Sequence, residues 1–331
     1  MTLSFNLGAL PGNDFHAGMD VIAGETPLRT LVHVPQRGFM YDHMATTLAI
    51  LHNLPVEKGP RSWRLSTRAQ IISRRLWDKK ERELDAIEQH WSGAEQLQVS
   101  CVGPWSLSTQ LELADGHRAL TDSGALKDIV DIFLANLIDY AQQLKKRCHA
   151  ECDIILDEFA LDNLIKGRVK GTHDFDILPA YHPKELAELL AHIISTLQQH
   201  YRHVRLAMLG QEPNFFLAQL AQPDSFLISQ DTIKGTHLYD DLAQALSEGL
   251  GIGFGCVGIG DYVDTDKSIP RDKARRIAKL FDELSISREQ LADIEIHPRQ
   301  HLDQGRLIDA AHALACARVC AEIVQRDGRE L

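Results

Sequence analysis

Two adjacent carboxylates follow an apolar stretch near the middle of the chain. Residues 152–156 (Cys-Asp-Ile-Ile-Leu) predict a buried strand, and Asp157 and Glu158 stand where this strand meets its loop. In a barrel of alternating strands and helices, the C-terminal ends of the strands converge on one mouth, where ligands bind. Asp157 and Glu158 are therefore candidate binding residues. The alternative for Asp157 is a structural role, as a helix N-cap or an ion-pair partner.

A second candidate is the turn 103–106 (Gly-Pro-Trp-Ser), which follows the apolar run 95–102 in the same way. Loops after parallel strands converge, so Gly103, Trp105 and Ser106 are expected at the same mouth as Asp157. From about residue 95 onward, short apolar runs alternate with amphipathic stretches, which is typical of parallel strands joined by helices.

Strands are predicted at 3–7, 28–34, 95–102, 152–157, 203–209, 225–229, 252–259 and 293–297. Helices are predicted at 124–147, 183–200, 213–221, 238–249, 270–284 and 304–326. These elements predict an α/β fold, a single (β/α)8 TIM barrel over residues 1–331, with a doubly wound open sheet as the alternative. The charged segment from Glu57 to Gly93 reads as a helical excursion between the second and third strands.

The glycine-rich run 249–255 lacks the Gly-Lys-Ser/Thr ending of a phosphate-binding loop, and its glycines alternate. We interpret it as a barrel strand whose glycines allow close packing. The six cysteines are too sparse for a disulfide scaffold in a chain of 331 residues. Cys316 and Cys320 lie four apart in a helical stretch, and buried thiols are favoured over a metal pair because no matching pair follows.

Composition limits the partners. The formal net charge of −11 argues against a nucleic-acid partner, because phosphate backbones attract clustered Lys and Arg. No run approaches the roughly 20 apolar residues that span a bilayer. The amino terminus also lacks the features of a signal peptide. We therefore expect a cytoplasmic protein that acts on a small molecule, without a membrane partner.

Three motifs resemble the catalytic barrel of the cobalamin-independent methionine synthases. Residues 8–11 (Gly-Ala-Leu-Pro) are similar to that family's Gly-Ser-Phe-Pro turn, residues 103–106 to its Gly-Pro-Val/Trp-Thr turn, and residues 157–161 to its Asp-Glu-Pro-Ala-Leu. The resemblance can be followed from Ser4 to about His301. It implies a TIM barrel that transfers a methyl group to the homocysteine thiol, as in methionine biosynthesis. The turn at Gly8 and Ala9 would hold the amino-acid end, and Asp157 would accept the substrate ammonium.

The resemblance also implies where zinc would bind, and there the chain differs from the family. The family uses a His-x-Cys, a Glu and a Cys, which would fall at Leu206, Met208, Gln230 and Gln300 in this sequence. None of these side chains suits zinc. We therefore expect no zinc site at these positions and no other cofactor. His237, His297 and His301 leave open an alternative metal site.

Three functions remain in competition. The first is methyl transfer to an amino-acid or thiol substrate, with a folate or a corrinoid as methyl donor. The second is a metal-free barrel that binds an amino acid or thiol and serves a regulatory role or another reaction. The third is a purely structural role, which predicts a mouth filled by bulky side chains such as Phe39, Trp105 and Phe159. The sequence does not identify the oligomeric state.

Overall fold

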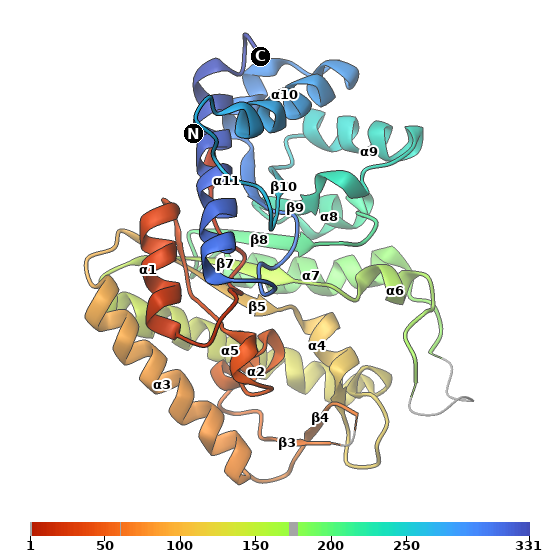
Figure 1. The fold of residues 1–331 in the computed structure, drawn as a ribbon. Coiled ribbons are helices and arrows are strands. Elements are labelled where there is room, and N and C mark those ends of the chain that lie inside the picture. Colours follow the sequence, from red (N-terminus) through yellow and green to blue (C-terminus); the bar gives the residue numbers. More distant parts are fainter. Residues whose placement is uncertain (1, 60, 172–177) are drawn as a thin grey trace.

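Eight parallel strands form the central sheet of the protein. The computed structural model describes residues 2–59, 61–171 and 178–331, shown in Figure 1. In spatial order the strands are β1 (Leu3–Ser4), β11 (Glu295–Pro298), β10 (Ile252–Val257), β9 (Ser225–Ser229), β8 (His203–Met208), β7 (Glu151–Asp157), β5 (Gln96–Val102) and β2 (Arg29–Thr30).

The two edges of this sheet meet. Parallel bridges join Phe5 to Leu28 and Ala9 to His33, in the segments that adjoin β1 and β2. The backbone N–H of Leu10 donates to the carbonyl of His33, and that of His33 donates to the carbonyl of Gly8. The sheet is thereby closed into a (β/α)8 barrel, which confirms the predicted TIM-barrel fold and excludes the open-sheet alternative.

Helices cover the outside of the barrel (Figure 1). They are α1 (Phe15–Glu25), α2 (His43–Ile50), α3 (Ile71–Trp91), α4 (Pro104–Gln110), α5 (Ser123–Cys148), α6 (Leu161–Ile165), α7 (Pro183–Leu197), α8 (Phe215–Ala221), α9 (Thr236–Ser247), α10 (Ser268–Glu283) and α11 (Leu307–Asp327). The six predicted helices are all present, with ends that differ by a few residues. Among the described residues, no helix has the length and apolar character needed to cross a bilayer.

The excursion between the second and third barrel strands is only partly helical. It begins with a hairpin of β3 (Val56–Lys58) and β4 (Trp63–Leu65), which β6 (Leu111–Glu112) extends, and α3 follows. Residue 60 lies outside the described part. Glu57 pairs across the hairpin with Arg64. The predicted helical excursion is confirmed by α3, which spans Ile71–Trp91, and only the charged residues before it form the short hairpin.

Glycines and cysteines serve packing. A Cβ atom on Gly253 would lie 2.4 Å from Leu227, and one on Gly255 would lie 2.8 Å from the Cα of Arg299. These glycines therefore let β10 approach its neighbours closely, as the alternating pattern predicted. All six cysteines are buried and form no disulfide, and Cys316 and Cys320 lie on the buried face of α11.

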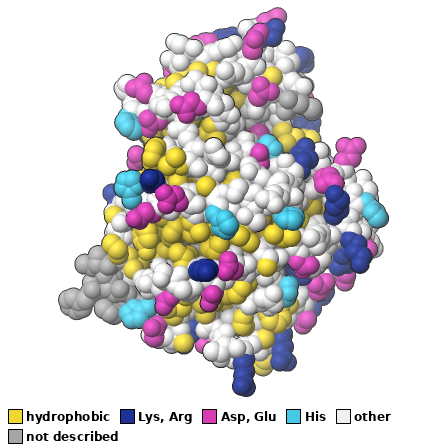
Figure 2. Space-filling model, turned by 180° about the vertical axis from the view of Figure 1, so that it is seen from behind, with side chains coloured by type: hydrophobic (Ala, Val, Ile, Leu, Met, Phe, Trp, Pro, Cys, Tyr) yellow, Lys and Arg dark blue, Asp and Glu magenta, His cyan; other side chains and the backbone are white. Residues whose placement is uncertain are grey.

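Side chains alternate between two cores along each strand. Phe5, Leu7, Leu28, Ile155, Ala207 and Leu227 form a small cluster inside the barrel. The residues between them, such as Leu206, belong to the larger core that the helices cover. On the face opposite to that of Figure 1, apolar side chains gather over the middle of the molecule, while Lys and Arg are interspersed with Asp and Glu around them (Figure 2).

A buried ion network fills the barrel on the N-terminal side of the inner apolar cluster. Arg205 is 1% exposed and donates to Asp153 at 2.9 Å and to Glu295 at 2.6 Å. It also donates to the side-chain carbonyl of Gln98 at 3.0 Å. Burial alone would lower the pKa of Arg205, but the two carboxylates raise it, so the guanidinium stays charged.

We expect Arg205→Met to reduce the free energy of unfolding by about 3–5 kcal/mol, because it leaves two buried carboxylates without their cation. Urea unfolding followed by circular dichroism measures this loss. Arg202→Met is the matched control, since Arg202 also binds Asp153 but has a side chain 42% exposed. The control should lose less than about 1 kcal/mol. Equal losses in the two variants would contradict the assigned role of Arg205.

Candidate functional site

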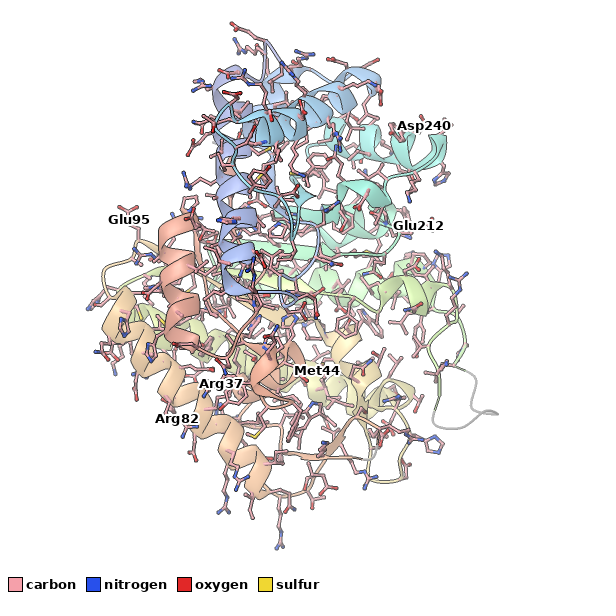
Figure 3. All side chains as sticks on the ribbon, in the orientation of Figure 1. Arg37, Met44, Arg82, Glu95, Glu212 and Asp240 are labelled. Carbon is pink, nitrogen blue, oxygen red and sulfur yellow. The ribbon has the colours of Figure 1, made fainter. Side chains whose placement is uncertain are left out.

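Asp157 is the last residue of β7, and its side chain turns toward the mouth of the barrel. Its Oδ2 accepts a hydrogen bond from His301 Nε2 at 2.9 Å and lies 3.3 Å from His43 Nδ1. His43 begins α2, and His301 lies in the loop after β11. Figure 3 labels Met44, the residue that follows His43, on α2. One carboxylate oxygen thus connects two segments that are distant in sequence.

A third imidazole lies against this pair. The ring of His33 stacks on that of His43, with 4.9 Å between their centroids, and it meets the ring of His301 edge-on at 6.5 Å. His33 is 2% exposed, and within the described residues neither of its ring nitrogens has a hydrogen-bond partner. We call His33, His43, Asp157 and His301 the histidine cluster.

The turn at Gly8 makes room for this cluster. Gly8 has a φ of +109°, and a Cβ atom there would lie 2.3 Å from the Nε2 of His33. Ala9 is buried and bridges to His33 through the backbone. The resemblance implied that Gly8 and Ala9 hold the amino-acid end of a substrate. In the structure, their visible contribution is to position His33.

Charge in the cluster resides on Asp157. Burial alone would raise the pKa of this carboxyl, but the hydrogen bonds from His301 and His43 outweigh burial and hold it well below its usual range. Burial lowers the pKa of His43, although Asp157 opposes the shift. Burial and the neighbouring histidines lower the pKa of His33 well below its usual value. Near neutral pH the cluster therefore combines an ionised carboxylate with neutral imidazoles at His33 and His43.

Glu158 is directed away from the mouth. It is fully buried, and its carboxylate accepts hydrogen bonds from Trp105 N at 3.0 Å, Ser106 N at 2.8 Å and Ser106 Oγ at 2.7 Å. Ser106 Oγ in turn accepts from Ala160 N at 3.0 Å. Burial raises the pKa of Glu158 to about 7, although these donors oppose the shift. This arrangement fixes the start of α4 beside the end of β7.

The side chain of Trp105 also makes contacts within the protein. Its indole N–H donates to the carbonyl of Leu186 at 3.1 Å, and its ring lies near Tyr181. The structure therefore brings Asp157 to the mouth, while Trp105, Ser106 and Glu158 hold the loops that surround it. Gly103 belongs with this second group, because a Cβ atom there would lie 2.4 Å from the carboxyl carbon of Glu158.

The residues at the positions that the resemblance assigns to zinc lie in different surroundings and do not fit zinc. Leu206 and Met208 lie in the outer core under the helices, while Ala207 between them faces the barrel interior. Gln230 begins a 3-10 turn after β9, and Gln300 lies in the loop after β11. None of these four residues carries an imidazole, thiol or carboxylate, so they do not fit zinc.

The three histidines named from the sequence have different places. His301 joins the cluster. His297 lies buried inside the barrel, where its ring stacks on Phe5 and its Nδ1 lies 2.8 Å from the carbonyl of Pro298. His237 has a side chain 85% exposed and pairs with Asp241 on α9.

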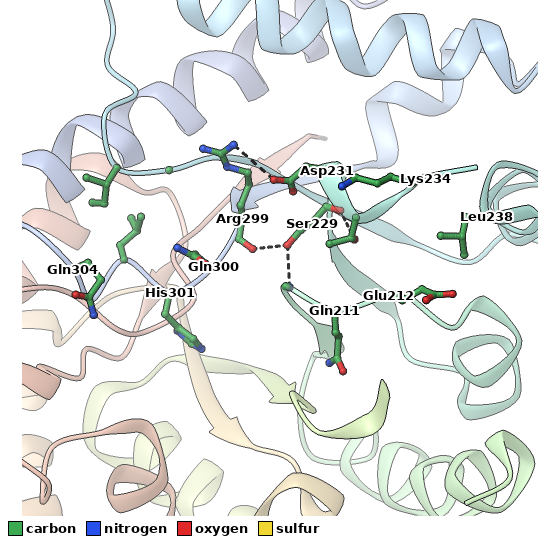
Figure 4. Close-up of a pocket in the computed structure, with 15 residues that line it drawn as sticks. Gln211, Glu212, Ser229, Asp231, Lys234, Leu238, Arg299, Gln300, His301 and Gln304 are labelled. Atoms are coloured by element: carbon green, nitrogen blue, oxygen red, sulfur yellow. Dashed lines mark hydrogen bonds and ion pairs between the residues drawn. The ribbon is translucent and has the colours of Figure 1, made fainter. Parts of the chain in front are cut away.

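A cavity of about 630 Å³ opens beside the cluster. It lies at the C-terminal ends of β8 to β11, and Figure 4 shows polar and charged side chains around it. Its lining includes Gln211, Glu212, Ser229, Asp231, Lys234, Arg299, Gln300 and His301. His301 belongs to both the lining and the cluster. Phe39, Trp105 and Phe159 are not among the lining residues, so the bulky side chains that a structural role would require do not fill this cavity.

Sequence reasoning missed His33 and His43. A usable signal was present for His33, because it is the second-last residue of the predicted strand 28–34 and so lies near a strand end, as Asp157 does. His43 follows Asp42, whose side chain accepts from Ala45 N and caps α2. A polar side chain at a strand end, followed by a capped helix, is the pattern that marks a loop at the mouth of a barrel.

Comparisons with known proteins support the fold. Neither the protein-family models nor the curated proteins gave a match. The chain is similar to the solved structure of a B12-independent methionine synthase from Shewanella sp. W3-18-1 in complex with selenomethionine, with 11% identity, a TM-score of 0.57 and 99% of each chain covered. It is also similar to a methyltransferase from Methanosarcina mazei, with 12% identity, a TM-score of 0.52, and 96% of this chain and 93% of that chain covered.

At these identities the likeness shows the fold alone. The class that fold and site define together is a (β/α)8 barrel, of the shape found in these methyltransferases, with a buried histidine and carboxylate cluster at its mouth. Asp157 lies at this mouth. Gly8 makes room for His33 of the cluster, and Gly103 makes room for Glu158, which supports the neighbouring loop.

The close approach of Gly103 to Glu158 gives a test of the loop anchor. We expect Gly103→Ala to lower the free energy of unfolding by about 1–3 kcal/mol, because the added methyl overlaps the buried carboxyl group. Gly24→Ala is the control, since a Cβ atom on Gly24 meets nothing within 4 Å. Gly24 lies in the last turn of α1, where the change to Ala should be neutral or stabilise by up to about 1 kcal/mol. Chemical unfolding of both variants decides, and a neutral Gly103→Ala would refute the anchor.

Proposed function

We propose that this protein binds a thiol-bearing amino acid or another small thiol at the mouth of its barrel and transfers a methyl group to the substrate sulfur. The observation that carries the proposal is the ionised, buried carboxylate of Asp157. Its Oδ2 is occupied by two histidines, whereas within the described residues its Oδ1 has no hydrogen-bond partner. Buried acceptors are normally satisfied, so one further donor is missing. A substrate ammonium would supply it.

The adjoining cavity supports a small polar substrate. A volume of about 630 Å³ lies within the usual range of small-molecule sites, roughly 300–1,000 Å³. Its lining carries both signs of charge. Lys234 and Arg299 are the cations, and Glu212 and Asp231 are the acids. Such a lining suits a zwitterion, whose carboxylate can face the cations while its ammonium faces an acid.

The proposed transfer joins the substrate sulfur to the methyl carbon. The bond from that carbon to its donor breaks, and its electron pair returns to the donor. The thiol proton leaves to a base, for which His301 is a candidate because it lines the cavity. A folate or a corrinoid is the proposed donor.

A second candidate is a metal-free barrel that binds an amino acid or thiol without transferring a methyl group. The observation in its favour is that Leu206, Met208, Gln230 and Gln300, where the resemblance implies zinc ligands, carry no side chain that suits zinc. Zinc ordinarily lowers the pKa of the attacking thiol, and without it the thiolate is scarce near neutral pH.

Calorimetric titration with homocysteine and methionine tests the proposal. We expect Asp157→Asn to weaken binding about 10- to 100-fold, because a hydrogen bond to a charged group contributes roughly 1.5–3 kcal/mol. Asp241→Asn, on the surface of α9, is the matched control and should bind as the unaltered protein does. Circular dichroism of both variants checks that they fold.

A methyl-transfer assay with methylated folate and methylcobalamin separates the two candidates. Methionine formed from homocysteine supports the transferase, and binding without turnover supports the binding protein. Absence of binding by any amino acid or thiol would contradict both.

A further inference from the structure

We infer that His43, Asp157 and His301 form a binding site for one divalent transition-metal ion, at a place different from the positions that the resemblance assigns to zinc. The three ligand atoms are His43 Nδ1, Asp157 Oδ2 and His301 Nε2, and they all lie within 4.8 Å of one another. This inference does not rest on methyl transfer, because it concerns the cluster alone. It departs from the sequence expectation that the chain holds no cofactor.

The spacing of the three atoms suits a metal ion. Ligands bound tetrahedrally at roughly 2.1 Å stand roughly 3.4 Å apart. In the cluster, Asp157 Oδ2 lies 3.3 Å from His43 Nδ1 and 2.9 Å from His301 Nε2. Small outward shifts of the two rings would admit an ion between them. The ligands come from α2, from the end of β7 and from the loop after β11, so the folded barrel assembles the site in advance.

The chemistry of the donors narrows the choice of ion. Two imidazole nitrogens with one carboxylate oxygen suit zinc, cobalt, iron or nickel, whereas calcium and magnesium prefer oxygen ligands. Three protein ligands leave at least one coordination position open in a four-coordinate site, as in catalytic zinc centres. Because His301 also lines the cavity, that open position can face a substrate that enters there.

A second, independent observation points to the same place. His33 is 2% exposed, its ring stacks on that of His43, and within the described residues both its ring nitrogens have no partner. A buried imidazole without a hydrogen bond is costly unless a ligand satisfies it. His33 is therefore placed to donate to a water molecule or a substrate on the ion, or to act as a fourth ligand after a rotation of its ring.

The competing explanation is a metal-free hydrogen-bond network. In that case His43 and His301 each donate a proton to Asp157 Oδ2 and hold no ion. Metal binding requires each coordinating nitrogen to be deprotonated, so in a neutral imidazole the proton moves to the other ring nitrogen. The two explanations therefore differ in metal content, which can be measured without substrate or methyl donor.

The test uses the full chain, stripped with a chelator and then titrated separately with Zn²⁺ and Co²⁺. We expect one ion per chain by elemental analysis, visible absorption bands of four- or five-coordinate Co²⁺, and a raised Tm in the loaded protein. His43→Ala, Asp157→Asn and His301→Ala should each weaken binding by more than about 100-fold, because even changes to residues that support a ligand cost about 10- to 100-fold. His237→Ala is the matched control and should bind the ion as the unaltered chain does, since His237 lies exposed on α9.

The inference is overturned if the unaltered chain binds no stoichiometric ion. It is also overturned if His237→Ala loses as much affinity as His301→Ala, or if Asp157→Asn retains the ion. If an alanine variant fails to fold, the corresponding His43→Gln or His301→Gln variant replaces it, since Gln keeps a similar size without an imidazole. The metal titration uses no homocysteine, and homocysteine binding can be titrated on the chelator-stripped chain, so this inference and the proposed function can fail separately.

Discussion

The negative charge of Asp157, buried at the mouth of the barrel, is the constraint on which the rest of the site depends. An isolated carboxylate in a protein interior is strongly unfavourable, and it persists only if polar partners surround it. His43 and His301 supply those partners, so α2 and the loop after β11 must both dock at the end of β7. Gly8 must lack a side chain because His33 occupies the space that a Cβ atom would need.

Asp157 and Glu158 are adjacent buried carboxylates, but they have different hydrogen-bond partners and therefore different roles. The side-chain carboxylate of Glu158, the neighbour of Asp157, accepts from Trp105 and Ser106 and so fixes the start of α4. A second charged layer lies deeper, where Arg205 joins Asp153 and Glu295. The inner apolar cluster, including Ile155 and Ala207, separates these two charged layers. The Arg205 guanidinium is thus paired with carboxylates at depth, whereas within the described residues Asp157 Oδ1 and both ring nitrogens of His33 at the mouth have no hydrogen-bond partner.

Much of this arrangement could be predicted from the sequence, because the signals were local. The apolar runs and their periods gave the eight strands, and the position of Asp157 at a strand end gave its place at the mouth. The partners of Asp157 could not be predicted in this way, since His301 is 144 residues distant in sequence and only closure of the barrel brings it near. The sequence also did not show which side chains at the end of β8 point into the barrel. The end of β8 is buried on both sides and residues 206–208 are all apolar, so this stretch of sequence does not show that Ala207 faces the interior while Leu206 and Met208 do not.

The most direct measurement is X-ray diffraction at the zinc absorption edge from crystals of the zinc-loaded protein. The account predicts one strong anomalous peak among His43 Nδ1, Asp157 Oδ2 and His301 Nε2, with an open coordination position toward the cavity that His301 lines. An anomalous map without a peak at that position, or with zinc bound only by surface residues such as His237 and Asp241, would contradict it.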